Sequence, residues 1–258
     1  MTVIPVLLYH SVSDRPARPD RHWTVSRSEF AGHMDAIEES GREALRITEL
    51  AAALRTERPL PERPVAVTFD DGYADTYEAV ESLLARGLPS TVYITTGEVG
   101  AANRLTRSDA TELARLPSVE VGAHAVQHRR LDELRDAELA HEILTSKVQL
   151  EELAQTSVRS FAYPHGAYDR RVREAVVAAG YRSAAAVKNA VSHPSDDPFA
   201  IARWTVTAGT TATRIIEVLE GVGVPRAWAH ERVRTRAYRS VRRRRRRVGL
   251  ALGVRHSG

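Results

Sequence analysis

The chain has 258 residues, a formal net charge of +4 and no cysteine. Its length suits one α/β barrel or one doubly wound domain, and its 43% apolar and 27% charged residues exclude a wholly disordered chain. The lack of cysteine excludes disulfides, thiolate nucleophiles and cysteine-bound zinc, so a metal site must use histidine and carboxylate ligands.

The predicted elements alternate between strands and helices along the chain. From apolar runs and β-branched residues we expect strands at 3–9, 65–69, 90–95, 119–123, 160–163, 183–187 and 201–206. Helices are expected at 26–40, 48–55, 74–85, 108–116, 136–154, 169–179 and 211–219. This alternation predicts a parallel sheet with helices outside it, and seven strands in about 220 residues favour a barrel, closed or incomplete.

The N-terminal stretch does not resemble a secretory signal. It has no basic residue, its apolar run is short and interrupted by Pro5, and it ends at Tyr9 and His10, as a buried strand would. No run approaches the roughly 18 apolar residues of a membrane span. We therefore expect a soluble, cytoplasmic protein.

Polar side chains follow four of the predicted strands. In α/β barrels the carboxyl ends of the strands meet at one rim, where such folds place their sites. We therefore expect these side chains to come together. They are His10 after the first strand, Asp70 and Asp71 after strand 65–69, His124 and His128 after strand 119–123, and Pro164 and His165 after strand 160–163.

Three of these residues form a candidate metal site. Asp71, His124 and His128 make a two-histidine, one-carboxylate set, which leaves coordination positions open for water and substrate. The histidines are four residues apart and can face one ion if they lie on one turn. Asp70 remains free as a base, but neighbouring side chains on a strand point to opposite faces. The turn after the strand must therefore redirect one carboxylate, and Gly72 permits this.

Each signal also has an ordinary explanation. A DDG sequence after a strand is often a polar turn with a helix cap, and an HxxxH pair is more often two surface histidines. The combined set is more specific than any of its members, because the signals fall at separate strand ends.

Three sequence motifs resemble those of a known family. TFDDG at 68–72, GAHAVQH at 122–128 and FAYPHG at 161–166 are similar to ordered motifs of the polysaccharide deacetylases, the NodB-homology group or carbohydrate esterase family four. The resemblance extends over about residues 3–220, and LLYHSV at 7–12 resembles the subgroup that includes biofilm poly-N-acetylglucosamine deacetylases. The resemblance implies an α/β fold with a single deformed (β/α)7 barrel. It also implies an enzyme that hydrolyses the N-acetyl group of an amino sugar and releases acetate.

The resemblance also implies roles for individual residues. Asp70 is the general base. Asp71, His124 and His128 hold one divalent metal ion, with zinc first and cobalt, nickel or iron as alternatives. The backbone N–H of His165 is assigned to the oxyanion that develops during the reaction.

Two family positions are filled differently in this chain. Ala162 replaces the arginine of the third motif that orients the base, and Arg203 is expected to supply the missing cation and keep Asp70 ionised. The C-terminal leucine-histidine motif, which supplies the general acid, is not visible after residue 206. In the subgroup named above the acid comes from the N-terminal strand. His10, as an imidazolium, is therefore the proposed general acid, and His230 is its competitor.

The sequence limits the substrate only by class. Tyr163, Pro164 and Trp204 are assigned to substrate contacts. An aromatic content of 6% argues against a long aromatic groove and favours a short N-acetylated sugar or glycan precursor. Ordinary packing is the more frequent role of such rings, that of Trp204 included; the other candidates for stacking on a sugar are Trp23, Tyr73 and Tyr168.

Other functions compete with this prediction. One keeps the site but changes the bond, to an O-acetyl ester or a non-sugar amide. Another is an inactive glycan-binding relative, against which the intact Asp70, Asp71, His124 and His128 argue. A third is a nucleic-acid binder.

Charge is unevenly distributed along the chain. Residues 226–258 contain twelve arginines and one glutamate, a net +11, which leaves −7 for residues 1–225. We therefore divide the chain into a catalytic domain, 1–225, and an Arg-rich tail, 226–258. The run Arg242–Arg247 is typical of a solvated terminus. The next interpretation is contact with an anionic membrane surface at its inner face, and nucleic acid comes third because the domain is acidic.

Overall fold

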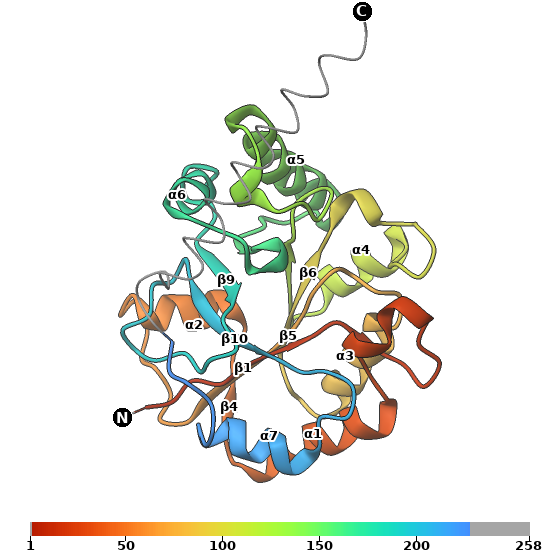
Figure 1. The fold of residues 1–258 in the computed structure, drawn as a ribbon, viewed down its shortest axis with the longest axis vertical. Helices are drawn as coiled ribbons and strands as arrows, with labels where there is room; N and C mark the ends of the chain where they lie inside the picture. The colour runs from red at the N-terminus through yellow and green to blue at the C-terminus, as the bar shows by residue number, and fades with distance from the viewer. Residues whose placement is uncertain (1, 228–258) are drawn as a thin grey trace, which may run out of the picture.

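The computed structural model describes residues 2–227 of the protein (Figure 1). Residue 1 and residues 228–258 lie outside the described part, and with them His230 and the Arg242–Arg247 run. Among the helices of residues 2–227, none is both long enough and apolar enough to cross a membrane.

Seven parallel strands form a closed barrel in the described part of the chain (Figure 1). Their order is β1–β10–β9–β8–β7–β6–β5, and β5 pairs with β1 to close the circle. Each corresponds to a predicted strand, so the predicted single α/β barrel is confirmed. The strands are β1 (Val6–Tyr9), β5 (Pro64–Phe69), β6 (Ser90–Ile94), β7 (Val119–Ala123), β8 (Ser160–Ala162), β9 (Ser183–Val187) and β10 (Ile201–Thr205).

Seven α-helices surround the barrel within residues 2–227 (Figure 1). They match the predicted helices: α1 (Arg27–Glu39), α2 (Ile47–Leu54), α3 (Thr76–Ala85), α4 (Arg107–Arg115), α5 (Asp136–Ala154), α6 (Arg170–Ala178) and α7 (Ala212–Leu219). Helix α1 shows why these segments begin where they do. Ser26 and Glu29 form a capping box, in which each side chain accepts the other's backbone N–H, at 3.2 and 2.7 Å.

Several short elements lie outside the predicted ones. Strands β2 (Ser11–Val12) and β3 (Thr24–Val25) pair with each other, and β4 (Glu43–Ala44) pairs with the start of β5. Elements of this length are set by tertiary contacts and leave no periodic signal in the sequence. The 3₁₀ helices are η1 (Arg18–Trp23), η2 (Thr96–Glu98), η3 (Leu131–Glu133) and η4 (Pro164–Gly166).

Apolar side chains fill both sides of the barrel wall. All six residues of β5 are buried, as expected for a parallel strand that is covered on both faces. Val67 and Phe69 belong to the large core cluster that also contains helix residues. Ala66, on the other face of β5, clusters with Ala162 and Ala185 of neighbouring strands. These small residues leave space inside the barrel for larger polar side chains.

The strand order brings distant segments of the chain to one rim. Strand β1 lies between β5 and β10, so His10, which follows β1, is flanked by Asp70 after β5 and by Arg203 within β10. Strand β7 lies two places from β5 and delivers His124. The carboxyl ends of these parallel strands point the same way, and the site is built there.

Candidate active site

Asp70 is held at the rim by Arg203. The backbone N–H of Asp70 donates to the carbonyl oxygen of Tyr9 at 2.9 Å, which extends the β1–β5 pairing. Two guanidinium nitrogens of Arg203 donate to the two carboxylate oxygens of Asp70, at 2.6 and 2.7 Å. Arg203 is 0% exposed and Asp70 2%. The structure thus brings together the two residues that the sequence paired.

The pKa of Asp70 follows from this arrangement. Burial would raise it, but the positive charge of Arg203, followed by that of His124, outweighs the effect of burial. The pKa of Asp70 therefore lies below its ordinary value, and the carboxylate is ionised at neutral pH.

A left-handed turn brings Asp71 to the same rim. The φ angle is 72° at Asp71 and 73° at Gly72, so the redirection begins at Asp71 itself, one residue earlier than the glycine alone indicated. Aspartate tolerates this region better than most residues. The carbonyl oxygen of Gly72 accepts the N–H of Leu105 at 2.9 Å, which fixes the turn. As a result Asp70 and Asp71 line one cavity.

His124 is fixed in one orientation by the barrel wall. Its Nδ1 lies 2.8 Å from the carbonyl oxygen of Ala162. A carbonyl only accepts, so Nδ1 carries the proton and Nε2 is directed to the carboxylates. Nε2 lies 3.4 Å from Oδ1 of Asp71 and 3.7 Å from Oδ2 of Asp70. Burial alone would lower the pKa of His124, but the two carboxylates raise it overall.

His128 reaches the same carboxylate from an irregular loop. Its Nε2 lies 3.2 Å from Oδ1 of Asp71. The four-residue spacing allows both histidines to face one ion from a single helical turn, but Ala125 and His128 have left-handed φ angles of 62° and 50°, so the two rings are brought together by an irregular loop instead. Contacts with neighbouring elements set this conformation. Burial and the nearby charge of His124 lower the pKa of His128 to about 4, which keeps it neutral.

The geometry of Asp71, His124 and His128 fits a metal ion. One ligand atom from each lies within 4.8 Å of the others. Zinc–ligand bonds of about 2.0–2.1 Å in tetrahedral geometry place two ligand atoms about 3.4 Å apart, close to the observed 3.2 and 3.4 Å. Oδ1 of Asp71 is also buried without a hydrogen-bond partner in the described part of the chain. A bound cation would satisfy that oxygen.

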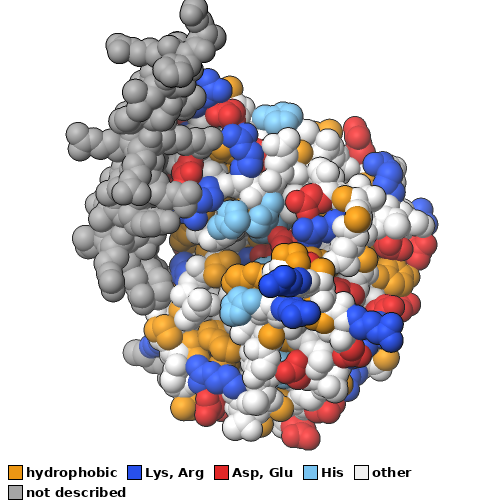
Figure 2. All heavy atoms as spheres, turned by 45° about the vertical axis from the view of Figure 1, so that its right-hand side comes forward, with side chains coloured by type: hydrophobic (Ala, Val, Ile, Leu, Met, Phe, Trp, Pro, Cys, Tyr) orange, Lys and Arg blue, Asp and Glu red, His pale blue; other side chains and the backbone are white. Residues whose placement is uncertain are grey.

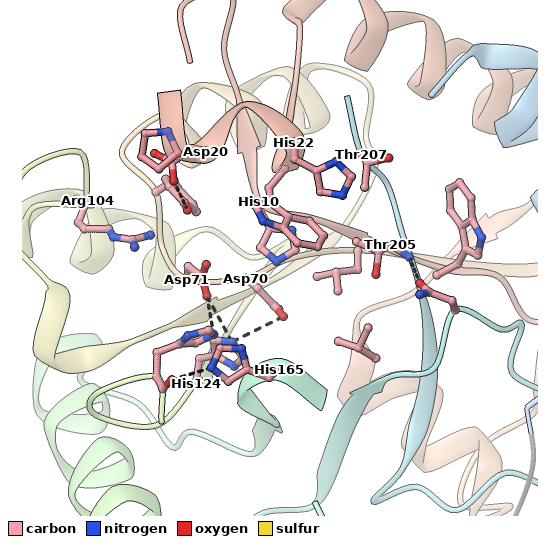
Figure 3. Close-up of a pocket in the computed structure, with 18 residues that line it drawn as sticks. His10, Asp20, His22, Asp70, Asp71, Arg104, His124, His165, Thr205 and Thr207 are labelled. Carbon is pink, nitrogen blue, oxygen red and sulfur yellow. Dashed lines mark hydrogen bonds and ion pairs between the residues drawn. The ribbon is translucent and has the colours of Figure 1, made fainter. Parts of the chain in front are cut away.

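His10 lines the same cavity as these residues (Figure 3). Its ring lies against that of Trp23, with centroids 5.2 Å apart, and among residues 2–227 its buried Nδ1 has no hydrogen-bond partner. Burial lowers the pKa of His10, although Asp70 and Asp71 oppose this. His10 is therefore neutral at neutral pH, which differs from the imidazolium expected from the sequence. An acid role requires that His10 gain a proton during the reaction.

His165 supports His128 from the third motif. It has a left-handed φ of 58° within η4. Its ring packs on that of His128, with centroids 4.3 Å apart, and its Nε2 donates to the carbonyl oxygen of His128 at 3.1 Å. The use of its backbone N–H for an oxyanion stays a prediction.

The structure does not bring Tyr163 and Pro164 to the cavity. Both are buried, and the hydroxyl of Tyr163 donates to the carbonyl oxygen of Phe199 at 2.9 Å. The Tyr163 ring stacks on Tyr168, with centroids 4.5 Å apart. The expected substrate contacts of Tyr163 and Pro164 are therefore not met, because these side chains are turned into the core.

The carboxylates and histidines described above line a cavity of about 760 Å³. Figure 2 shows histidine side chains beside a hollow on this face, with acidic and basic side chains next to them. Three of the four candidate stacking rings, those of Trp23, Tyr73 and Trp204, line the cavity, although packing was the favoured role for each; Tyr168 stacks on Tyr163 instead. Sequence reasoning missed several other lining residues. They are Asp20 and His22 of η1, Thr205 at the end of β10, and Arg104 and Asn189 between named elements.

Comparisons with known proteins agree with this geometry. The model of the polysaccharide deacetylase family matches residues 57–184. YxkH of Bacillus subtilis (strain 168), which carries the name of a polysaccharide deacetylase, is 24% identical over 220 residues, 85% of this chain and 77% of that protein. The poly-beta-1,6-N-acetyl-D-glucosamine N-deacetylase of Escherichia coli (strain K12) is 34% identical over 76 residues, 30% of this chain and 11% of that protein.

The fold is also similar to that of solved deacetylases. The structure of the Streptococcus pyogenes deacetylase PplD, in complex with acetate, superposes with a TM-score of 0.77 at 19% identity, covering 84% of this chain and 98% of that one. This chain thus shares the closed seven-strand α/β barrel of that deacetylase. With the family match, the chain carries a polysaccharide deacetylase domain of the NodB-homology type.

Proposed function

We propose that the protein is a metal-dependent hydrolase that removes an N-acetyl group from an amino sugar in a glycan or glycan precursor. One observation carries this proposal: Asp71, His124 and His128 converge beside an ionised Asp70 at one end of a cavity. Metal ligands next to an ionised carboxylate that is not itself a ligand are the groups that hydrolysis of an unreactive amide requires.

Asp71, His124 and His128 would hold one divalent ion, which we propose to be zinc, with cobalt, nickel or iron as alternatives. Such an ion supplies Lewis acidity, which lowers the pKa of water and polarises an acyl oxygen. The carbonyl of Ala162 sets the ring of His124 for this role through its 2.8 Å hydrogen bond, as outer partners of metal-binding histidines do.

The chain's own residues account for the proton transfers. Asp70, kept ionised by Arg203, accepts a proton from the attacking water. The leaving nitrogen needs a proton when the C–N bond breaks, and His10 delivers it. Because His10 is neutral in the free protein, it receives that proton during the reaction, and Asp70 is its source. The backbone N–H of His165 is assigned to the developing oxyanion.

The far end of the cavity suits a sugar ring. Trp204, Asn189 and Thr205 line the cavity, and Thr205 lies apart from Asp70, Asp71 and His124 in Figure 3. Together with the named activity of the E. coli relative, this supports an N-acetylated sugar as substrate.

Acetate release from N-acetylated amino sugars tests the proposal. The full-length protein is loaded with zinc, and its rate is compared with those of Asp70→Asn and His124→Ala, both expected to lose at least about a hundredfold. His141→Ala is the matched control, since His141 is exposed on α5 and bonds only to Thr145 among the described residues. Full activity in the two site variants would contradict the roles assigned to them.

The nature of the bond is tested with the same protein. Release from O-acetylated sugars but not from N-acetylated ones would replace the proposal with an O-acetyl esterase. Stoichiometric zinc without turnover on either class would indicate an inactive glycan-binding protein.

We place the protein in the cytoplasm, with its Arg-rich tail on an anionic membrane surface. The tail lies outside the described residues, and its net +11 supports this placement. Salt-sensitive binding to vesicles containing anionic lipid is expected for the full chain and not after deletion of residues 226–258. Binding that survives the deletion would contradict it.

A further inference from the structure

The loop of residues 124–128, called here the HxxxH loop, has a conformation that its own sequence does not favour. Ala125 and His128 both have left-handed φ angles, which cost energy for residues other than glycine. Both metal-ligand candidates of the loop depend on this conformation. Contacts from outside the loop must therefore stabilise it.

One side of the HxxxH loop is held by η2. The N–H of Thr96 donates to the carbonyl oxygen of Ala125 at 3.2 Å, and the N–H of Gly97 to that of Val126 at 2.9 Å. A Cβ at Gly97 would lie 2.5 Å from the oxygen of Val126. Only glycine therefore lets η2 approach the loop so closely.

The other side of the loop is held by a carboxylate of α5. One oxygen of Glu142, Oε2, accepts the N–H of Val126 at 2.8 Å and that of Gln127 at 2.9 Å. These two amides belong to the residues between His124 and His128. Carbonyls and amides of the same short segment are thus fixed by two different elements.

Glu142 is placed where a charged residue is costly. It is 1% exposed and lies in the buried row of α5 with Leu139, Ile143 and Ser146. Fully buried glutamates are rare unless they are paired. Within residues 2–227 its partners are backbone amides of the HxxxH loop, and no ion pair with lysine or arginine is formed. Leucine would suit helix packing alone, so the carboxylate serves the loop.

We infer that Glu142 is a positioning residue for the metal site: it presets the HxxxH loop so that His124 and His128 both face Asp71. The inference rests on the metal site of the proposed function. A preset loop lowers the conformational cost of binding, so the effect appears in metal affinity. Glu142 does not touch the reacting atoms and acts through the backbone of the loop.

Two substitutions separate position from charge. Glu142→Gln keeps an oxygen at the same reach, so both amide bonds are retained while the charge is lost. Glu142→Asp keeps the charge but is shorter by one methylene, so it cannot hold both amides. Glu142→Ala removes both properties. Ser146→Ala is the matched control, because Ser146 is buried one turn further on and bonds to the Ile143 carbonyl of its own helix.

The measurement is zinc affinity of the full-length protein, by competition with a chromophoric chelator. We expect Glu142→Ala and Glu142→Asp to bind zinc about 10- to 100-fold more weakly, and Glu142→Gln and Ser146→Ala to remain within about threefold of wild type. Hydrogen exchange of the metal-free protein gives a second readout. The amides of Val126 and Gln127 are expected to exchange faster in Glu142→Asp and at the wild-type rate in Glu142→Gln.

Each alternative outcome is decisive. Unchanged zinc affinity in Glu142→Ala and Glu142→Asp overturns the inference. A loss in Glu142→Gln with none in Glu142→Asp overturns it too, because charge and not position would then govern affinity. If zinc affinity depends on the position of the Glu142 carboxylate but the wild-type protein releases no acetate, only the proposed function is refuted. Wild-type protein that binds no divalent ion refutes both.

Discussion

Replacing Arg203 with methionine tests the electrostatic basis of the site. In Arg203→Met the Asp70 carboxylate stays buried but loses two hydrogen bonds of 2.6 and 2.7 Å from a cation. Removing one partner of a buried ion pair costs about 3–5 kcal/mol, and we expect the free energy of unfolding at pH 7 to fall by about this amount. Burial then dominates the pKa of Asp70, which rises above its ordinary value.

The pH dependence of stability should reverse in this variant. In the wild type the pKa of Asp70 is lowered, so its contribution is present above the unfolded value of about 3.9 and is lost as pH falls through the folded pKa. In Arg203→Met, Asp70 of the folded state takes up its proton at a higher pH than Asp70 of the unfolded chain does. The deficit relative to wild type therefore shrinks as the pH is lowered from 7 to 5.

Urea unfolding at pH 7 and pH 5 measures both effects. Acetate release against pH adds a third readout, since a protonated base moves the acidic limb of kcat/KM to higher pH. Arg203→Lys keeps the positive charge but cannot donate to both carboxylate oxygens of Asp70. Its unfolding free energy and its acidic limb should therefore lie between those of wild type and Arg203→Met. An unfolding free energy within about 1 kcal/mol of wild type, with an unmoved acidic limb, would refute the reasoning.

Three further predictions follow from other contacts. Tyr163→Phe should lose about 1 kcal/mol of stability, measured by urea unfolding, and keep its kcat, because the hydroxyl bonds to Phe199 and not to substrate; a large fall in kcat would restore the role in substrate binding. Burial lowers the pKa of His33, so the unfolded state takes up the proton first as pH falls below about 6.5, and stability drops; His33→Gln should flatten this slope in unfolding measured from pH 7 to 5. Gly97→Ala places a Cβ 2.5 Å from the oxygen of Val126 and should cost about 1–3 kcal/mol, seen as a lower Tm; an unchanged Tm would show that η2 can move away freely.

The barrel could be predicted because its signals are local. Apolar runs and helical periodicity located the seven barrel strands and the seven α-helices described in residues 2–227, but not the two-residue strands β2, β3 and β4. Parallel topology then placed Asp70, His124 and His10 at one rim without further information. Arg203 was found from a missing charge: the third motif carries Ala162 where a cation was expected, and a late strand supplied one.

The support of the site could not be predicted in the same way. The spacing of His124 and His128 says nothing about the left-handed conformation of Ala125 and of His128 itself, which depends on contacts with η2 and α5. Glu142 did leave a signal, a charged residue in the buried row of an amphipathic helix. The sequence pattern thus indicates that Glu142 is buried, but it does not show which groups Glu142 hydrogen-bonds to. For Tyr163 the motif was misleading. The sequence assigned this residue to a substrate contact, but its side chain packs in the hydrophobic core.

The closure of the barrel has a consequence for how the site comes into being during folding. Asp70 and Arg203 are 133 positions apart in the chain, and β1 gains its second neighbour only when β10, near the end of the domain, pairs with it. Contacts of such long sequence separation form slowly and late. While β10 of a nascent chain is still inside the ribosome, Asp70 lacks its partner Arg203. Catalytic competence should therefore appear in one late step, together with the last strand.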